Sequence, residues 1–252
     1  MRRSQLIEVA RDGSSRFTRI TDGLVEAKDG DTVFVRPGVY RENVTLSEGV
    51  SLIGAGPENT VLESDQGPIV RALDLKFALL LGFKVQRVLT QATQATAEEP
   101  SSDYEGEEEK EKECGVLVAS SDVTIMNCRV TGMARGDAIR IVGDASPVVV
   151  STVCDNNVFG IGCYDTCRPL LRHNTCRKNK LSGIVASDYC RVTVQLCLCE
   201  ANDYGIWSDG EAQMSLMGNC CRANMREGIV CGHRAGGRVV ASFNLCEANL
   251  WN

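Results

Sequence analysis

The chain has 252 residues, a net charge of −6 at neutral pH, 43% hydrophobic residues and 24% charged residues, a balance typical of one water-soluble domain. Its longest apolar run, residues 77–83, is too short to span a membrane, and no long apolar stretch of a secretory signal follows the charged N-terminus. No basic stripe favours nucleic acid binding. We therefore expect a single domain over residues 1–252, with neither a membrane nor a nucleic acid as partner.

A short amphipathic helix is predicted over residues 14–28. Ser14 or Ser15 can cap its first turn, and apolar residues then recur at helical spacing, at Phe17, Ile20 and Leu24. The sequence Asp-Gly-Asp at 29–31 has the turn chemistry that ends a helix. We expect this helix to cap the N-terminal end of the domain.

Short aliphatic runs follow the helix, separated by turns that contain glycine, proline or asparagine. These runs cover residues 32–35, 44–46, 50–54, 61–63, 78–81 and 83–85. Strands this short and this closely spaced suit a solenoid better than a β-sandwich, whose strands are longer.

Residues 90–113 interrupt this pattern. The segment is rich in Thr, Ala and Gln, and then has nine acidic residues and two lysines between Glu98 and Glu113, a charge of −7. The remaining chain therefore carries +1, because the total is −6. We expect a disordered acidic insert between coils, either a solvated tether or a docking segment for a basic partner.

From Cys114 onward the chain repeats itself. Gly-Ile pairs begin at residues 160, 183, 205 and 228, which are 23, 22 and 23 residues apart. Three strands of about four residues and three turns need about 22 residues, so each repeat corresponds to one coil, with successive coils about 4.8 Å apart. The sequence thus predicts an all-β fold, a right-handed parallel β-helix of three-strand coils.

The repeat assigns residues to stacked columns. We expect inward ladders of Cys154, Cys176, Cys199, Cys221 and Cys246 and of Ile161, Ile184, Ile206 and Ile229. The glycines that precede these isoleucines require a positive φ or a close approach. We also predict a turn column of asparagines that hydrogen-bond their stacked neighbours, formed by Asn156 or Asn157, Asn179, Asn202, Asn224 and Asn249. A second, partial column contains Asn174, Cys197, Asn219 and Asn244.

Thirteen cysteines would suggest disulfides in a secreted chain. Here most of them recur with the repeat, so we interpret them as reduced core thiols of a cytoplasmic protein. Their spacing does not match a zinc site, and only His173 and His233 could assist. We expect neither a metal nor a cofactor.

The sequence resembles the pectin lyase-like superfamily of parallel β-helices. Residues 115–252 resemble the repeat of F-box proteins with β-helix domains, and residues 12–20, 31–44 and 52–56 are similar to the opening of pectin methylesterases. The resemblance implies the fold. The glutamine-flanked aspartates of those esterases are missing, the nearest segment being 160–165, so no catalytic residue is carried over.

One face offers candidate site residues. Asp165 and Asp188 are 23 residues apart, as are Arg168 and Arg191, and Asp209 lies 21 residues beyond Asp188. Such a wall of stacked aspartates and arginines can bind a sugar, supply an acid and a base for catalysis, or bind Ca²⁺. It can equally consist of turn aspartates that pair with arginines in solvent.

Aromatic residues are few, which argues against a sugar-binding groove, and Tyr164, Tyr204, Trp207 and Trp251 are candidates for a protein interface. The sequence stops at Asn252, just after Cys246 begins a coil, so this end either docks on a partner or a second copy, or continues in a longer protein.

The leading hypothesis is a non-enzymatic cytoplasmic scaffold that binds protein partners through its faces or this end. It would belong to a ubiquitin ligase or to a cytoskeletal or ciliary complex. The alternative is a polysaccharide lyase, hydrolase or epimerase that uses Asp165 and Asp188, and a Ca²⁺-stabilised module is a third hypothesis.

Overall fold

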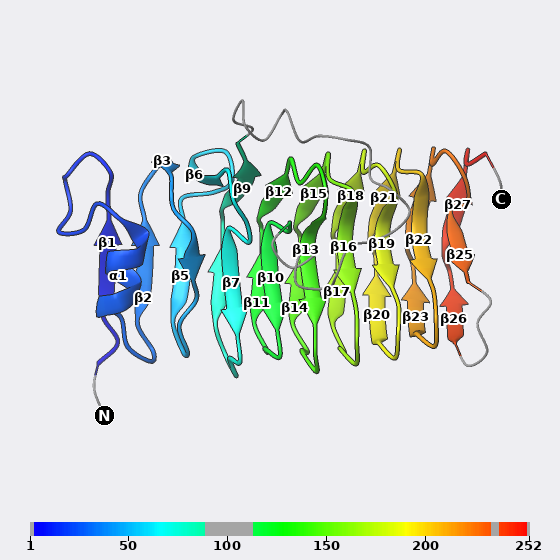
Figure 1. Ribbon diagram of the computed structural model, residues 1–252, viewed down its shortest axis with the longest axis horizontal. Coiled ribbons are helices and arrows are strands. Elements are labelled where there is room, and N and C mark those ends of the chain that lie inside the picture. Colours follow the sequence, from blue (N-terminus) through cyan, green and yellow to red (C-terminus); the bar gives the residue numbers. More distant parts are fainter. Residues whose placement is uncertain (1–2, 89–112, 233–236, 251–252) are drawn as a thin grey trace.

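Three parallel sheets wind around one narrow core in the computed structural model, which describes residues 3–88, 113–232 and 237–250 (Figure 1). Residues 90–112 of the expected insert, together with His233 and Trp251, lie outside the described residues. All neighbouring strands pair in parallel, each with the strand one coil earlier and one coil later. The predicted parallel β-helix with three strands a coil is confirmed.

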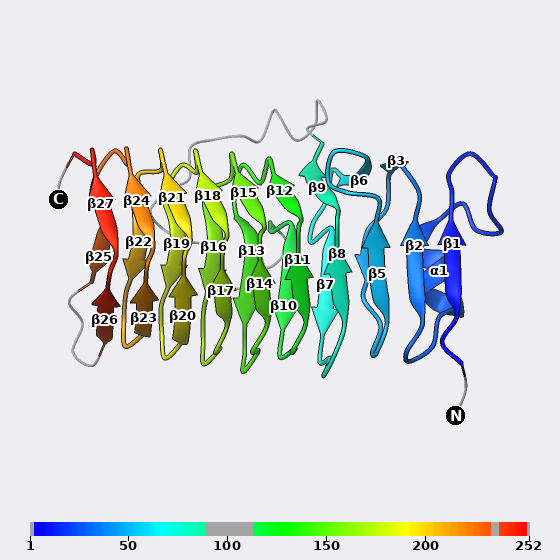
Figure 2. The ribbon, with the colours of Figure 1, turned by 180° about the vertical axis from the view of Figure 1, so that it is seen from behind.

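Each sheet runs the length of the solenoid, as the front and back views show (Figures 1 and 2). In spatial order, sheet A consists of β1 (Leu6–Val9), β2 (Thr32–Val35), β5 (Ser51–Gly54), β8 (Leu79–Leu81), β11 (Thr124–Met126), β14 (Val148–Val150), β17 (Leu170–Arg172), β20 (Arg191–Gln195), β23 (Gln213–Met217) and β26 (Arg238–Ser242). Sheet B consists of β3 (Gly38–Tyr40), β6 (Thr60–Ser64), β9 (Lys84–Arg87), β12 (Arg129–Thr131), β15 (Val153–Asp155), β18 (Thr175–Arg177), β21 (Leu198–Glu200), β24 (Cys220–Arg222) and β27 (Leu245–Glu247). Sheet C consists of β4 (Val44–Thr45), β7 (Val70–Leu73), β10 (Val116–Ala119), β13 (Asp137–Val142), β16 (Phe159–Cys163), β19 (Ser182–Ala186), β22 (Tyr204–Ser208) and β25 (Ile229–Cys231).

The inward ladders form as the repeat predicts. The five cysteines from Cys154 to Cys246 are register partners across sheet B, and the four isoleucines from Ile161 to Ile229 are partners across sheet C. Most of these side chains are fully buried. Stacking identical side chains fills the core without a change of volume from coil to coil.

The glycine column is explained by close approach. A Cβ atom at Gly183 would lie 2.8 Å from the carbonyl oxygen of Gly205, and one at Gly205 would overlap the carbonyl oxygen of Gly228. The φ angles of Gly160, Gly183, Gly205 and Gly228 are outside the left-handed region, so backbone strain is not the reason for glycine.

Asparagines join successive coils through their side chains. Asn202 is buried, and its Oδ1 accepts hydrogen bonds from the backbone N and the Nδ2 of Asn179, both at 3.0 Å. Its Nδ2 donates to the carbonyl of Cys176 at 3.0 Å and to Oδ1 of Asn224 at 3.2 Å. The column contains Asn157 rather than Asn156, and the second column also forms, from Asn174 through Cys197 and Asn219 to Asn244.

The predicted helix bounds of 14–28 are wrong, because helix α1 covers Ile20–Glu26. Neither Ser14 nor Ser15 caps it. The amides of Ile20 and Thr21 instead donate to the carboxylate of Glu42 from the next coil, at 2.8 and 3.0 Å. The cap was missed because it is non-local.

Helix α1 packs against β1, β2 and β4 at the N-terminal end of the solenoid (Figure 1). Gly23 permits this approach, since a Cβ atom there would lie 2.9 Å from Val9. Phe17, which was expected on the helix face, instead forms a bridge with Val9.

Candidate functional site

Asp165 and Asp188 lie at the same turn of successive coils, between sheets C and A. Both have a left-handed backbone, with φ of 63° and 57°. The amide of Gly143 donates to Oδ2 of Asp165 at 2.7 Å, and the amide of Asp165 donates to Oδ2 of Asp188 at 3.0 Å. Each carboxylate therefore binds the backbone of the preceding coil, a structural task that an Asx-type turn residue performs well.

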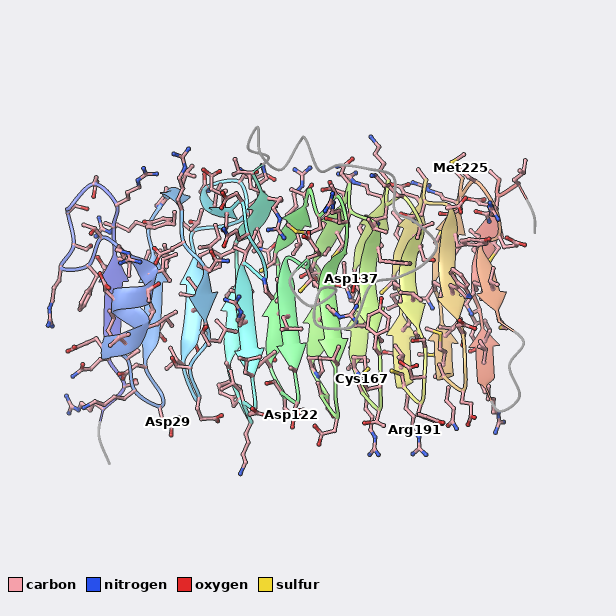
Figure 3. All side chains as sticks on the ribbon, viewed as in Figure 1. Asp29, Asp122, Asp137, Cys167, Arg191 and Met225 are labelled. Atoms are coloured by element: carbon pink, nitrogen blue, oxygen red, sulfur yellow. The ribbon has the colours of Figure 1, made fainter. Side chains whose placement is uncertain are left out.

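The arginines of the predicted wall do not pair with these aspartates. Arg168 and Arg191 are exposed, and neither occurs among the ion pairs formed within the described ranges. Arg191 lies on the rim of the solenoid (Figure 3) and begins β20. The amide of Asp209 bonds to the carbonyl of Ala186, at the corresponding turn of the next coil.

Arg191 borders a shallow trough of about 370 Å³ on the outer side of sheet A. Arg191, Gln213 and Arg238 form one column across β20, β23 and β26, and Thr193 and Ser215 stand beside it. The trough thus offers two guanidinium groups, an amide and two hydroxyls. Such groups bind anions or sugar hydroxyls, but the described residues that line the trough include no acidic side chain.

Between β1, whose outward residues are Leu6 and Glu8, and the trough, most outward positions of sheet A are apolar. From β2 to β17, twelve strand positions point outward in two adjacent columns. Four of them are Thr32, Ser51, Thr124 and Arg172, and none is acidic. The other eight form what we call the apolar face: Phe34, Ile53, Leu79, Leu81, Met126, Val148, Val150 and Leu170.

All eight side chains of the apolar face are partly exposed, and Met126 reaches 37%. Water-facing positions of a sheet are normally polar, so this apolar surface is a candidate binding surface. None of these residues had been singled out from the sequence.

The outer side of sheet B provides the contrast. Its column from Asp155 through Arg177, Glu200 and Arg222 to Glu247 alternates in charge at every coil. Arg222 bonds Glu200 at 2.9 Å, and Arg177 lies 3.6 Å from Asp155. This column of sheet B is thus largely neutralised by its own alternating charges.

The outer side of sheet C carries a buried polar cluster. Arg140 Nη1 donates to Asp137 at 3.0 Å, the hydroxyl of Tyr164 donates to Asp137 at 3.2 Å, and the guanidinium lies 4.1 Å from the centre of the Tyr164 ring. Gly162 leaves room for that ring, because a Cβ atom there would lie 2.5 Å from the Tyr164 hydroxyl. Cys114, Leu117 and Val142 pack beside this cluster.

These surroundings shift the acidity of the cluster. Burial, followed by the charge of Asp137, raises the pKa of Tyr164 well above its usual value. Burial opposes the charge of Arg140, yet Asp137 outweighs it and raises the pKa of that guanidinium. Tyr164 is therefore a neutral hydrogen-bond donor that stabilises a buried ion pair, and its position leaves little of the ring for an interface.

Tyr204 and Trp207 lie together on β22, with ring centres 5.2 Å apart, and Arg226 lies 5.4 Å from the Tyr204 ring. The structure thus brings together two of the four predicted interface residues, Tyr204 and Trp207, whereas Tyr164 belongs to the buried cluster around Asp137. All thirteen cysteines are free, and most are buried.

No group of three His, Cys, Asp or Glu side chains that could hold a metal occurs in the described part of the chain. None of the described helices has the length and apolar character needed to cross a membrane.

Residues 110–249 match the family described as right handed beta helix region, which is more than half of the chain. The chain belongs to the right-handed β-helix family. Its predicted handedness and its predicted pectin lyase-like resemblance are thereby confirmed. No curated protein matches the sequence.

Among solved structures, pectate lyase Pel9A has a TM-score of 0.70 at 10% identity, covering 100% of this chain and 78% of the lyase. Pectin methylesterase from carrot has a TM-score of 0.62 at 13% identity, covering 97% and 82%. Pectin methylesterase from Yersinia enterocolitica has a TM-score of 0.57 at 12% identity, covering 93% and 94%. At these identities the similarity concerns the fold alone.

Proposed function

We propose that this right-handed β-helix is a non-enzymatic scaffold that recognises a partner protein through the apolar face of sheet A. The observation that carries the proposal is the absence of any acidic residue from twelve outward positions on six neighbouring strands, eight of which are apolar. Protein-binding surfaces have such uncharged centres.

The partner that fits is a protein with a flat apolar surface and an acidic rim. Six strands at the usual spacing span about 24 Å, and two columns two residues apart make the face flat and narrow. Arg172, Arg191 and Arg238 lie on the C-terminal side of the same sheet, so an acidic rim on the partner would complement them.

A photo-cross-linking amino acid at position 126 tests this surface, with one at Thr175 on sheet B as the matched control. We expect a discrete adduct from position 126 whose partner peptide is apolar and lies beside acidic residues. Met126→Glu should weaken binding of the purified partner at least tenfold, and Thr175→Glu should leave it unchanged. Equal labelling from both positions would refute the proposal.

The proposal places the protein in the cytoplasm, within a larger assembly such as a ubiquitin ligase or a cytoskeletal or ciliary complex. Thirteen free and mostly buried thiols support a reducing compartment. Imaging of the tagged full-length protein tests the location, and a purely extracellular signal would contradict it.

A carbohydrate-active enzyme is the second candidate, because of the trough beside Arg191. Its guanidinium groups and hydroxyls match the carboxylates and hydroxyls of uronic acid polymers. Incubation with a panel of such polymers tests it. Turnover that is lost in both Arg191→Ala and Asp188→Ala would replace the scaffold proposal by this one.

A further inference from the structure

Two buried thiols touch each other beneath the turn that contains Asp165 and Asp188. The Sγ atoms of Cys167 and Cys190 are 3.1 Å apart, and neither residue is exposed to solvent. The backbone around them is in register, because the amide of Arg191 donates to the carbonyl of Cys167 at 2.8 Å. The two thiols thus belong to successive coils and are held side by side.

The geometry of this pair is close to that of a disulfide. Disulfides join Cα atoms about 4.4–6.8 Å apart, with a sulfur–sulfur bond of about 2.05 Å. Stacked coils place equivalent Cα atoms about 4.8 Å apart. The sulfur atoms therefore need to approach by about 1 Å, which small side-chain rotations supply.

The long cysteine ladder of sheet B is less suitable. Cys176 and Cys199 are in-register partners on parallel strands, and their Cβ atoms point the same way into the core. Their Cβ atoms therefore keep roughly the coil spacing of about 4.8 Å, whereas a disulfide needs about 3.5–4.5 Å. Cys167 and Cys190 instead lie just before strands β17 and β20, and their Sγ atoms are already 3.1 Å apart.

We propose that Cys167 and Cys190 are a modification site, a thiol pair that hydrogen peroxide converts into a disulfide between two coils. In the first step one thiolate attacks the peroxide, its sulfur is oxidised to a sulfenic acid, and the peroxide is reduced to water. In the second step the other thiol attacks this sulfenic sulfur, the S–S bond forms, and a second water leaves. Two thiols and one peroxide thus give one disulfide and two waters.

Burial of the pair slows the reaction, and the exposed turn above it gives peroxide access. The turn above it is exposed, with Tyr189 at 62%, so a local opening of this turn admits peroxide. A hydrogen bond with Cys163 raises the pKa of Cys167, and the contact with Cys167, followed by burial, raises that of Cys190. Since the thiolate is the reactive form, the rate rises with pH.

The test is a peptide map of the native, full-length protein after peroxide treatment and blocking of free thiols. Cleavage before Asp165 separates Cys163 from Cys167. We expect one dominant cross-linked pair of peptides, joined through residues 167 and 190, with a mass lower by two hydrogens than the two reduced peptides. Its rate of formation should increase about tenfold for each unit of pH, and reduction with dithiothreitol should remove the link. The melting temperature should rise by about 5 °C.

Variants separate this pair from its neighbours. Cys163→Ser and the exposed-site control Cys231→Ser should retain the link, and Cys167→Ser should abolish it without a new link elsewhere. If Cys167→Ser fails to fold, the map of the unaltered protein decides. A dominant 163–167 link, links spread over the sheet B ladder, or a link formed only in denaturant would each overturn the proposal.

Discussion

Replacing Asn224 by alanine tests how much the asparagine column contributes to the stability of the solenoid. Asn224 Oδ1 accepts from the backbone N of Asn202 at 3.0 Å and from its Nδ2 at 3.2 Å. Its Nδ2 donates to the carbonyl of Cys199 at 3.1 Å and to Oδ1 of Asn249 at 2.8 Å. The substitution therefore removes four buried hydrogen bonds.

The magnitude follows from what the four partners retain. Asn202 Nδ2 still bonds Cys176, and Asn249 Oδ1 still accepts from the backbone N of residue 224. The backbone N–H of Asn202 loses its bond, which costs about 1–3 kcal/mol for a buried donor, and the other losses add about 1 kcal/mol each. We expect the free energy of unfolding to fall by about 4–6 kcal/mol.

The adjacent Met225 provides the control, because its side chain is 71% exposed and points away from the body at the rim (Figure 3). Met225→Ala should change the stability by less than about 0.5 kcal/mol. Urea unfolding compares the two variants, and hydrogen exchange at the amide of Asn202 reports on that coil alone. A loss below about 1 kcal/mol, with unchanged exchange, would refute the argument.

Three further predictions concern other parts of the solenoid. Gly205→Ala should lower the free energy of unfolding by about 1–3 kcal/mol or more in urea unfolding, since the new Cβ atom would overlap the carbonyl oxygen of Gly228. Gly13→Ala should lower it by about 1–2 kcal/mol, because Gly13 has open space around it but a φ of 79°. Because the pKa of Tyr164 is raised in the folded state, stability should fall by up to about 1.4 kcal/mol per pH unit above 10.0, and Tyr164→Phe should flatten this slope in alkaline melting curves. A hydrogen bond from Arg41 lowers the pKa of Glu63, so its contribution is present above pH 4.5 and is lost as pH falls through the lowered value. Glu63→Gln should remove that dependence of stability on acid pH in urea unfolding. The effect should be less than about 1 kcal/mol, because the side chain of Arg41 is exposed.

The C-terminal half could be predicted from the sequence because its coils resemble one another. Cys176 pairs with Cys199, and Ile184 pairs with Ile206, at the spacing that the Gly-Ile repeat defines. A constant period fixes which residues are stacked, whatever the side-chain chemistry. The Asn column was predicted for the same reason, with hydrogen bonds between stacked neighbours that the structure confirms.

The N-terminal end could not be predicted in the same way. Strand β1 precedes the helix and was not anticipated, and the cap of α1 comes from Glu42 in the next coil. Both features depend on contacts between segments whose sequences do not repeat. Local capping rules chose Ser14 or Ser15 because serine side chains usually bond to nearby amides.

The apolar face escaped prediction because an unbroken apolar run does not reveal which of its residues point outward. Residues 79–81 are all leucine and 148–150 are all valine, and the central residue of each run is fully buried. Alternation identifies the two sides of a strand only where one side is polar. Pairing in the structure was needed to align the outer positions into two columns.

The same reasoning explains why stacking alone does not identify Asp165 and Asp188 as catalytic residues. In a β-helix, packing dictates the inward positions and backbone hydrogen bonding dictates the turns, so both select particular residues without any function. Outward positions on the strands have neither to fill the core nor to bond the backbone, and water favours polar residues there. A run of outward apolar residues therefore needs another cause, which the proposed partner would provide by covering them. For this reason the apolar face carries more functional information than the aspartates, whose carboxylates already bind the backbone of the preceding coil.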